Sequence, residues 1–424
     1  MRIDFVNKIF RGDKGIWFIF MFLCMISVME VFSATSQMSY NSESYWGPIS
    51  HHCIHMLMGA IVAVLIHLLP YKWWRLIGPF LLIVSFGLLI FLLAGPKSSV
   101  QTDNDASRWI KIFGFTLQPS EIAKLAVLIV VAMLLAKMDT SDIRSAWKSF
   151  GIIMGVAVLF SGLILFENLS TAALLFLTVV VMTIIAGVPW RILLPVYGAG
   201  IVALFLVLSF FILTPHHTMV QIARTTPLHR IDTWQNRITG FVVKMPDDPA
   251  DYIVTDDNRQ ITHTLIAVAS SGIIGVGPGN SIQRDFLSRA DNDVIYAIIL
   301  EELGLLGGIF VLILYIALLV RAGKIARKCK GMFPAMLVIG CALMLVLQAF
   351  IHILICVNMF PITGQTLPLI SRGGTSFIIS CMYIGIMLSV SRSFDEKKQS
   401  VAFEGDTGLE ATLKIDAEVC EQEL

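Results

Sequence analysis

Runs of about 20 apolar residues recur along this chain, and they restrict its fold more than any other feature. The hydrocarbon core of a bilayer is about 30 Å thick, so a helix crosses it with about 20 residues. Ten segments of the sequence fit this template: residues 15–35, 53–70, 75–95, 119–137, 148–166, 170–187, 191–214, 293–320, 333–357 and 367–391. We therefore expect an all-α integral membrane protein with about ten transmembrane helices.

The amino-acid composition agrees with this expectation and argues against other classes. Of the 424 residues, 56% are hydrophobic and 14% are charged, whereas about a quarter of the residues of a soluble domain are charged. The net charge is +1 and the membrane region has no basic block, so nucleic acid is not expected as a partner. The seven cysteines form no CxxC pair, which argues against a disulfide framework or a zinc site.

Lysine and arginine are distributed unevenly between the two sides of the predicted spans. The connections on one side collect most of them, whereas the opposite connections 36–52 and 167–170 contain none. Because positive charge in short loops favours the cytoplasmic side, we expect both termini in the cytoplasm.

This orientation divides the chain into parts. Residues 1–14 form a cytoplasmic N-terminus, residues 15–392 a polytopic membrane domain, and residues 393–424 a charged cytoplasmic tail that is expected to be disordered. The connection 215–292, between spans seven and eight, becomes a large extracytoplasmic loop. Loops of more than about 15 residues without a function are uncommon, so this loop is a candidate functional element.

Two carboxylates, Asp291 and Asp293, mark the end of the loop and the start of the eighth span. An isolated aspartate at a helix N-terminus is most often a cap, because it accepts hydrogen bonds from free backbone N–H groups. At the outer boundary of the membrane, however, such a carboxylate is also placed to act as a general base on a lipid-anchored substrate. The sequence leaves both interpretations open.

Further charges lie inside the apolar segments. Glu301 and Glu302 follow Asp293 by eight and nine residues, about 12 Å along a helix. Glu121 and Lys124 share one face at the start of the fourth span. Buried charges in a membrane are costly unless they are paired, so we expect Lys124 to bridge Glu121 and one of Glu301 or Glu302 across a polar cavity. A salt bridge that only packs helices together is an equal alternative.

Two outward-facing elements are candidate substrate-binding sites. Arg108 and Trp109 precede the fourth span, where the cation could hold a phosphate or simply reach the lipid headgroups. The stretch 358–376 is rich in proline, glycine and hydroxyl side chains, which favours a broken backbone that lines a cavity. Its candidate anion-binding residues are Ser371, Arg372, Gly373 and Gly374.

Three histidines, His51, His52 and His55, cluster at the start of the second span and superficially suggest a metal site. Histidines at the membrane interface are the better explanation. No resident metal can be assigned from the sequence.

Five motifs occur in a fixed order along the membrane region. They are Arg108-Trp109-Ile110, Gln118-Pro119-Ser120-Glu121-xx-Lys124, Ser271-Gly272 through Gly279-Asn280-Ser281, Asp293-xx-Tyr296-Ala297 with Glu301-Glu302-Leu303-Gly304, and Leu367-Pro368-Leu369-Ile370-Ser371. Each motif alone is weak, but together they are a strong signal. From the first span to about Ser393, the chain resembles the SEDS family (shape, elongation, division and sporulation), the membrane glycosyltransferases that include FtsW and RodA.

The resemblance implies a peptidoglycan glycosyltransferase that polymerises lipid II at the outer face of the cytoplasmic (inner) membrane. Its implied partners are a class B penicillin-binding protein (FtsI-like) and other division proteins. The family's essential aspartate falls on Asp293, and its glutamate–lysine pair falls on Glu121 and Lys124. Asp293 would deprotonate the 4-hydroxyl of the acceptor sugar, which attacks the donor's anomeric carbon with inversion and expels undecaprenyl pyrophosphate. Arg108 or a divalent cation, Mg²⁺ or Mn²⁺, would stabilise the leaving diphosphate, and no tightly bound cofactor is implied.

The chain departs from the family pattern in three places. The stretch before Asp293 reads Leu287-Ser288-Arg289 in place of a Leu-Pro-Glu motif and is one residue shorter, which leaves Asp291 as an alternative base. A tyrosine expected before the glycine pair is Arg372, an additional candidate phosphate contact. A Pro-Asp-Leu-Gly-Thr motif is replaced by Glu167-Asn168-Leu169-Ser170-Thr171.

Residues 366–371 and Asn358 are more similar to FtsW than to RodA, which favours a role in septal synthesis during cell division. The alternatives are an elongation-type (RodA-like) polymerase, a lipid II flippase and a non-catalytic scaffold. The strong charges predicted in the spans lie in the outer half or near the midplane, and this asymmetry favours chemistry at the outer surface over transport.

Overall fold

The structure is a computed structural model, and it describes residues 11–35, 47–94, 100–103, 106–112, 115–214, 234–235, 254, 258–287, 290–361 and 363–394. Most of the predicted N-terminal segment 1–14, most of the loop 215–292 and nearly all of the predicted tail 393–424 lie outside these residues. The expected disorder of the tail therefore stays a prediction.

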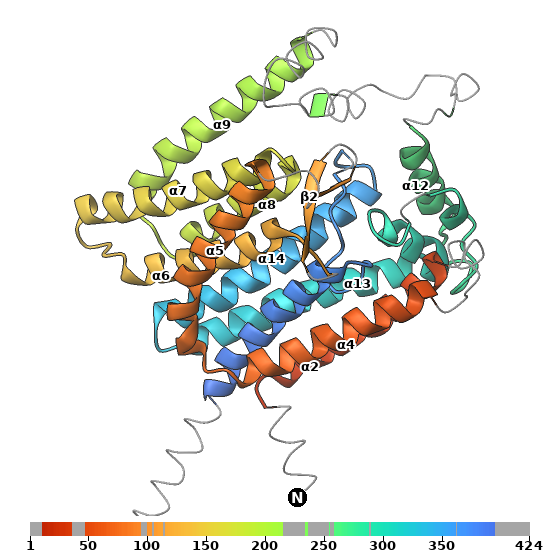
Figure 1. Ribbon diagram of the computed structural model, residues 1–424, viewed down its shortest axis with the longest axis horizontal. Coiled ribbons are helices and arrows are strands. Elements are labelled where there is room, and N and C mark those ends of the chain that lie inside the picture. The colour runs from red at the N-terminus through yellow and green to blue at the C-terminus, as the bar shows by residue number, and fades with distance from the viewer. Residues whose placement is uncertain are drawn as a thin grey trace, which may run out of the picture.

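Each of the ten predicted spans overlaps one helix of a compact bundle (Figure 1). The helices are α2 (Lys14–Ala34), α4 (Gly47–Leu68), α5 (Trp74–Ala94), α6 (Pro119–Lys137), α7 (Ile143–Leu165), α8 (Leu169–Ile185), α9 (Trp190–Leu213), α13 (Ile295–Lys328), α14 (Met332–Cys356) and the final helix Gly374–Phe394. Within the described residues, nine are long and apolar enough to cross a membrane, and α8 is a shorter apolar helix of 17 residues. The prediction of an all-α multipass membrane protein is confirmed.

Capping residues explain where several helices begin. The side chain of Asp13 accepts a hydrogen bond from the backbone of Ile16 at the start of α2. Asp142 accepts from two backbone N–H groups of α7, which begins at Ile143 rather than at the predicted residue 148. The caps satisfy N–H groups that the first helical turn leaves without partners. Helix ends were thus fixed by polar residues that lie outside the apolar runs.

A small antiparallel sheet precedes α6 and was not predicted. Its strands β1 (Val100–Asp103), β2 (Ala106–Ile112) and β3 (Phe115–Leu117) are arranged in the order β1-β2-β3. Strand β2 contacts both α5 and α6 (Figure 1). The sheet therefore brings the Arg108-Trp109 motif, which lies on β2, to the end of the bundle where α6 begins.

The loop between α9 and α13 contributes two further elements. These are helix α12 (Arg259–Ser270) and the one-turn helix η4 (Gln283–Asp285). Another single turn, η1 (Tyr71–Trp73), precedes α5. Helix α12 packs against α13.

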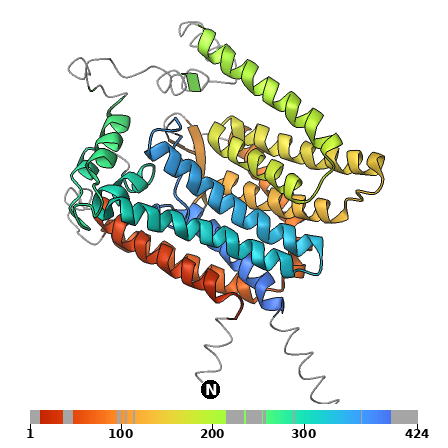
Figure 2. The ribbon, with the colours of Figure 1, turned by 180° about the vertical axis from the view of Figure 1, so that it is seen from behind.

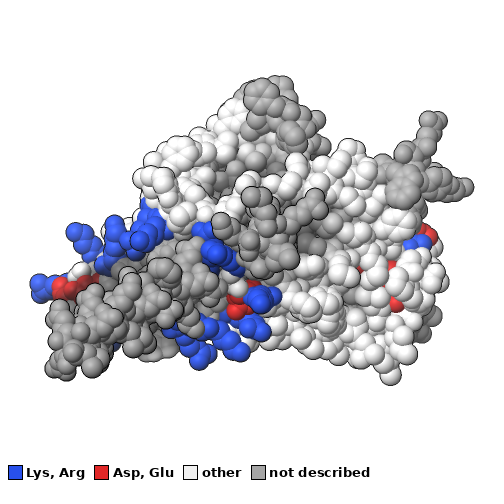
Figure 3. All heavy atoms as spheres, turned by 90° about the horizontal axis from the view of Figure 1, so that it is seen from below, with Lys and Arg blue, Asp and Glu red and all other residues white. Residues whose placement is uncertain are grey.

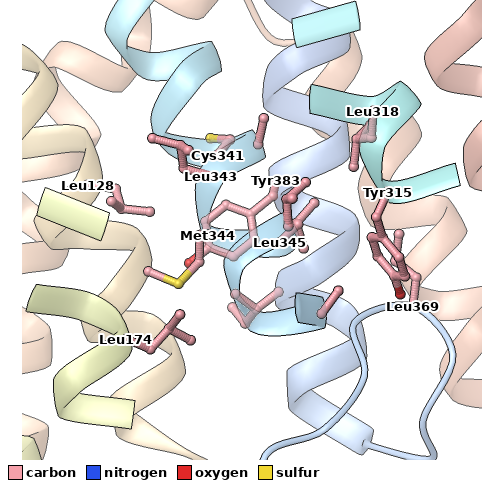
Figure 4. Close-up of a cluster of buried hydrophobic side chains, with 14 of the residues drawn as sticks. Leu128, Leu174, Tyr315, Leu318, Cys341, Leu343, Met344, Leu345, Leu369 and Tyr383 are labelled. Atoms are coloured by element: carbon pink, nitrogen blue, oxygen red, sulfur yellow. The ribbon is translucent and has the colours of Figure 1, made fainter. Parts of the chain in front are cut away.

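The core lies around α14 and the final helix, both of which are mostly buried. Figure 4 shows side chains from α6, α8, α13, α14 and the final helix converging in one cluster, with Met344 between Leu128 and Leu174. Tyr315 of α13 points at the non-helical segment around Leu369. The described part of the bundle is therefore close-packed at this cluster.

Helix α9 lies apart from this core (Figures 1 and 2). Its buried residues are Ile192 and Leu193 near its start and Phe211 near its end, and most of the side chains between them are exposed. Gln235 donates hydrogen bonds to the carbonyl oxygens of Phe211 and Thr214, at distances of 3.1 and 2.6 Å. The loop thus contacts α9 at its C-terminal end.

Lysine and arginine side chains gather toward one end of the bundle (Figure 3). The starts and ends of helices meet there: Arg321 of α13 lies 3.7 Å from Asp13 at the start of α2. Arg75 at the start of α5 lies 4.9 Å from the ring centroid of Phe333 at the start of α14. The charge asymmetry read from the sequence therefore corresponds to one end of the folded molecule.

Candidate active site

The two aspartates that precede α13 have different surroundings. Asp291 is 6% exposed, and its carboxylate lies 3.1 Å from the guanidinium of Arg372. The backbone N–H of Arg372 also donates to the carbonyl oxygen of Asp291, at 2.9 Å. Asp293 is half-buried and lies one residue before Val294, the N-cap position of α13. Asp291 is therefore held in a buried ion pair, next to the aspartate that the family resemblance selects.

A non-helical segment, residues 363–373, holds this site from the other side. It joins α14 to the final helix, which begins at Gly374 rather than at the predicted residue 367. The backbone of Leu369 has a positive φ of 64°, which is uncommon for leucine and breaks helical geometry. The side chain of Ser371 donates to the carbonyl oxygen of Asn292 at 2.8 Å. Ser371 and Arg372 thus bind the two residues directly before Asp293, which are Asp291 and Asn292.

The 363–373 segment is fixed to the bundle by hydrogen bonds to its backbone. Tyr315 of α13 donates to the carbonyl oxygen of Pro368. Ser27 of α2 donates to the carbonyl oxygen of Ile370 at 2.7 Å, and His52 of α4 lies 2.9 Å from the same hydroxyl. A buried backbone carbonyl without a partner is costly, so these side chains stabilise the irregular backbone inside the protein. This agrees with the broken backbone predicted from the sequence.

The histidines at the start of α4 have structural partners. His52 is buried beside Ser27, and the ring of His55 lies 2.6 Å from the carbonyl oxygen of His51 in its own turn. In the part of the chain that the structure describes, no group of three histidine, cysteine or carboxylate side chains is arranged to hold a metal ion.

Glu121 and Lys124 form the predicted ion pair, with 2.8 Å between the ammonium nitrogen and the carboxylate. Lys124 is fully buried and also donates to the side-chain oxygen of Gln348 on α14, at 3.2 Å. The predicted bridge from Lys124 to Glu301 or Glu302 is therefore wrong. Sequence reasoning missed Gln348, although a glutamine inside an apolar span, one turn before a histidine (His352), is itself a signal of a buried polar contact.

Glu301 and Glu302 bind the loop instead. Glu301 accepts hydrogen bonds from the side chain of Ser281 at 2.5 Å and from the backbone of Ile282 at 3.0 Å. Glu302 accepts from the backbone of Gly279 at 2.9 Å and of Ser281 at 3.2 Å, and its carboxylate also accepts from Ser33 of α2. Both carboxylates are buried, and these hydrogen bonds offset their desolvation. Glu301 and Glu302 therefore do not line the predicted polar cavity shared with Lys124.

The loop reaches these carboxylates because α13 is broken at Gly304. Its backbone angles, φ 70° and ψ −173°, interrupt the helix. The freed N–H groups of Leu305 and Leu306 donate to the carbonyl oxygens of Gly272 and Ile273, at 3.1 and 3.2 Å. Residues 272–284, which we call the latch, thus replace helical hydrogen bonds with contacts from the loop.

The other predicted residues take up scattered positions. Trp109 is half-buried on β2, and the side chain of Arg108 lies outside the described part of the structure. Gly374 begins the final helix beside His55, whose ring would lie 3.3 Å from a Cβ at that position. Asn168 caps α8 by accepting from two backbone N–H groups, so it does what the family's aspartate would do at a helix start.

The chain matches the family model described as a cell cycle protein, FtsW/RodA/SpoVE, over residues 13–396. A relative from Halomonas elongata, named "Probable peptidoglycan glycosyltransferase FtsW", is 32% identical over 377 residues, which cover 87% of each chain. "Stage V sporulation protein E" from Bacillus subtilis is 28% identical over 376 residues, which cover 87% of this chain and 94% of the relative.

Solved structures share the fold. A chain from the structure titled "Structural coordination of polymerization and crosslinking by a peptidoglycan synthase complex" has a TM-score of 0.66 and 22% identity, and the match covers 90% of this chain and 98% of that one. RodA from Thermus thermophilus has a TM-score of 0.61 and 21% identity, with 90% and 97% covered. The family inferred from the five motifs is confirmed, and the similarity to relatives named FtsW agrees with the motif comparison. This chain belongs to the FtsW/RodA/SpoVE family, the SEDS family of membrane proteins.

Proposed function

We propose that this chain is a peptidoglycan glycosyltransferase that polymerises lipid II into glycan strands at the outer face of the cytoplasmic membrane, with Asp293 as the general base. Family membership over nearly the whole chain and the printed names of its relatives support the activity. Asp293 removes the proton from the acceptor's 4-hydroxyl, and the oxygen attacks the donor's anomeric carbon with inversion. Undecaprenyl pyrophosphate leaves.

The pairing of Asp291 with Arg372 carries the choice of base. A carboxylate that is 6% exposed and bonded to a guanidinium has little access to a substrate. Asp293 is more accessible and lies at the start of α13, next to the residues that Ser371 and Arg372 bind. This supports Asp293 over Asp291.

The leaving diphosphate requires positive charge. Arg372 keeps 31% of its side chain exposed while it pairs with Asp291, and it lies two residues before the start of the final helix. The N–H groups at the start of that helix, which begins at Gly374 directly after Gly373, favour an anion. We assign Ser371, Arg372, Gly373 and Gly374 to diphosphate binding, with Arg108 and Trp109 as further candidates from β2.

Among the described residues, no three histidine, cysteine or carboxylate side chains are grouped so that they could hold a metal ion. A divalent cation, Mg²⁺ or Mn²⁺, therefore stays a proposal without an assigned ligand set or step. Polymerisation measured with either cation and with a chelator tests it.

We infer a septal role, with a class B penicillin-binding protein as partner and both termini in the cytoplasm. The similarity to FtsW relatives supports the first inference, and the fold shared with a chain of a peptidoglycan synthase complex supports the second. The basic end of the bundle supports the third. Cysteine labelling from either side of the membrane tests the orientation, and localisation of a fluorescent fusion during division tests the septal role.

The decisive experiment follows glycan chains made from labelled lipid II by the purified protein with its penicillin-binding partner. We expect Asp293→Asn to lower the rate by about 100-fold or more, the range of general-base catalysis, while the protein still binds its partner. Asp291→Asn is expected to melt at a lower temperature but to retain more activity than Asp293→Asn. Chains made equally well by Asp293→Asn would refute the assignment. Lipid II movement across proteoliposomes without polymer would favour the flippase alternative.

A further inference from the structure

Gln348 lies between the ion pair of α6 and the 363–373 segment, and its amide is bonded on both sides. The side-chain oxygen accepts from Lys124 at 3.2 Å. The side-chain nitrogen donates to the backbone carbonyl oxygen of Thr366 at 2.9 Å and lies 3.2 Å from the Thr366 hydroxyl. Gln348 is 4% exposed. Because one end must accept from an ammonium and the other must donate to a carbonyl, an amide fits this position and a carboxylate or thioether does not.

The segment beyond Thr366 forms a closed turn that leads to the aspartates. The backbone N–H of Leu367 donates to the hydroxyl of Ser371 at 2.8 Å, and the N–H of Ser371 donates to the carbonyl oxygen of Leu367 at 2.9 Å. The same hydroxyl of Ser371 donates to Asn292. One end of this turn is therefore held by Gln348, and the other end holds the residue next to Asp293.

Lys124 has no exposed surface, and both of its contacts with described residues are internal. In this arrangement it does not reach a lipid-linked substrate. Its charge is instead directed at the oxygen of Gln348, which orients the amide so that its nitrogen faces Thr366. The ion pair of α6 is thereby connected to the aspartate segment through one side chain.

We propose that Gln348 is a positioning residue for the glycosyl transfer, which ties the Glu121–Lys124 pair to the 363–373 segment and through it fixes Asp293. The inference rests on the proposed role of Asp293. Gln348 touches no substrate, so its loss displaces the base without removing a binding contact. Displacement of a catalytic group by about 1 Å can cost about 100-fold in rate.

The test compares two substitutions with a matched control in the complex with the penicillin-binding partner, using labelled lipid II. Gln348→Glu keeps an acceptor for Lys124 but cannot donate to the Thr366 carbonyl. Gln348→Met has a similar volume and makes neither bond. Thr178→Val is the control, because Thr178 is equally buried and its hydroxyl bonds the carbonyl of Leu174 within its own helix, α8.

We expect both Gln348 variants to lower kcat at least tenfold with KM within twofold of wild type, while Thr178→Val leaves both unchanged. Gln348→Met keeps the Glu121–Lys124 pair and puts no carboxylate oxygen against the Thr366 carbonyl, so it carries the test, on the same criteria, if Gln348→Glu fails to accumulate. An unchanged kcat in Gln348→Glu overturns the inference, and so does a raised KM at constant kcat, which would place Gln348 in substrate binding. Asp293→Asn in the same assay separates this failure from a failure of the proposed function.

Discussion

The break in α13 leads to a specific prediction for Gly304→Ala. At this position a Cβ would overlap the backbone of Ile273 and Ile274 and lie 2.5 Å from the backbone nitrogen of Gly275. The angles φ 70° and ψ −173° belong to a region that is essentially restricted to glycine, and side chains there cost about 1–3 kcal/mol. The latch would have to move away from the helix.

The stability lost in Gly304→Ala can be estimated from the hydrogen bonds that the latch makes. Its displacement removes the hydrogen bonds from Leu305 and Leu306 to the loop, each of which contributes about 1 kcal/mol when the groups are buried. Together with the backbone strain, the substitution should destabilise the protein by at least about 3 kcal/mol. It should also lower polymerisation, since the latch leads directly into the segment that carries the aspartates.

Gly323→Ala is the matched control. Gly323 lies in the same helix, and a Cβ there would meet nothing within 4 Å. Alanine in a helix interior is about 0.5–1 kcal/mol more favourable than glycine, so this variant should melt at or slightly above the wild-type temperature. Apparent melting temperatures are compared at one scan rate in detergent, because unfolding of such proteins is commonly irreversible. If Gly304→Ala has the same melting temperature as Gly323→Ala, the contacts of the latch do not depend on the break in α13 at Gly304.

Three further predictions test the buried polar groups. Lys124→Met leaves the carboxylate of Glu121 buried without its ammonium, which should cost about 3–5 kcal/mol of stability and reduce the protein level in membranes. Adding Glu121→Gln should restore part of that level. If Lys124→Met alone is as abundant as the double variant, the prediction is contradicted. The double variant Asp291→Arg with Arg372→Asp should melt at a higher temperature than either single variant, without regaining full activity. A double variant no more stable than the single variants would argue against the ion pair. Asn168→Ala should lower the stability by about 1 kcal/mol because the α8 cap is lost, whereas Asn168→Asp should be nearly neutral, as measured by thermal melting. If both variants lose the same stability, Asn168 does not act as a cap.

The sequence predicted the helices well because hydropathy is a local property. A run such as that of α14 is long enough to span a bilayer whatever its neighbours are. It predicted the ends less well, since the start of α7 depends on the Asp142 cap, and the start of the final helix follows the irregular backbone around Leu369, neither of which an apolar count includes. The sheet at β2 was missed because its strands are short, with 4, 7 and 3 residues.

The pairing of buried charges shows a second limit. The spacing of Glu121 and Lys124 fixes their common face, but the third partner depends on how α6 and α14 rotate against each other. A charge in a span requires a partner, which predicts a polar cavity around Glu301 and Glu302, but most of their hydrogen bonds come from backbone N–H groups of the latch, with serine hydroxyls adding the rest. Backbone donors leave no trace in residue type, so this choice could not be made from the sequence.

Helix α9 has a consequence for how the protein responds to its membrane. Its 24 residues make a rod about 36 Å long, whereas the hydrocarbon layer is about 30 Å thick. With few side chains packed against the bundle, its tilt is set by bilayer thickness and by its ends and not by neighbouring helices. A thinner bilayer will therefore change the angle of α9 first, while the close-packed helices around α14 keep their arrangement.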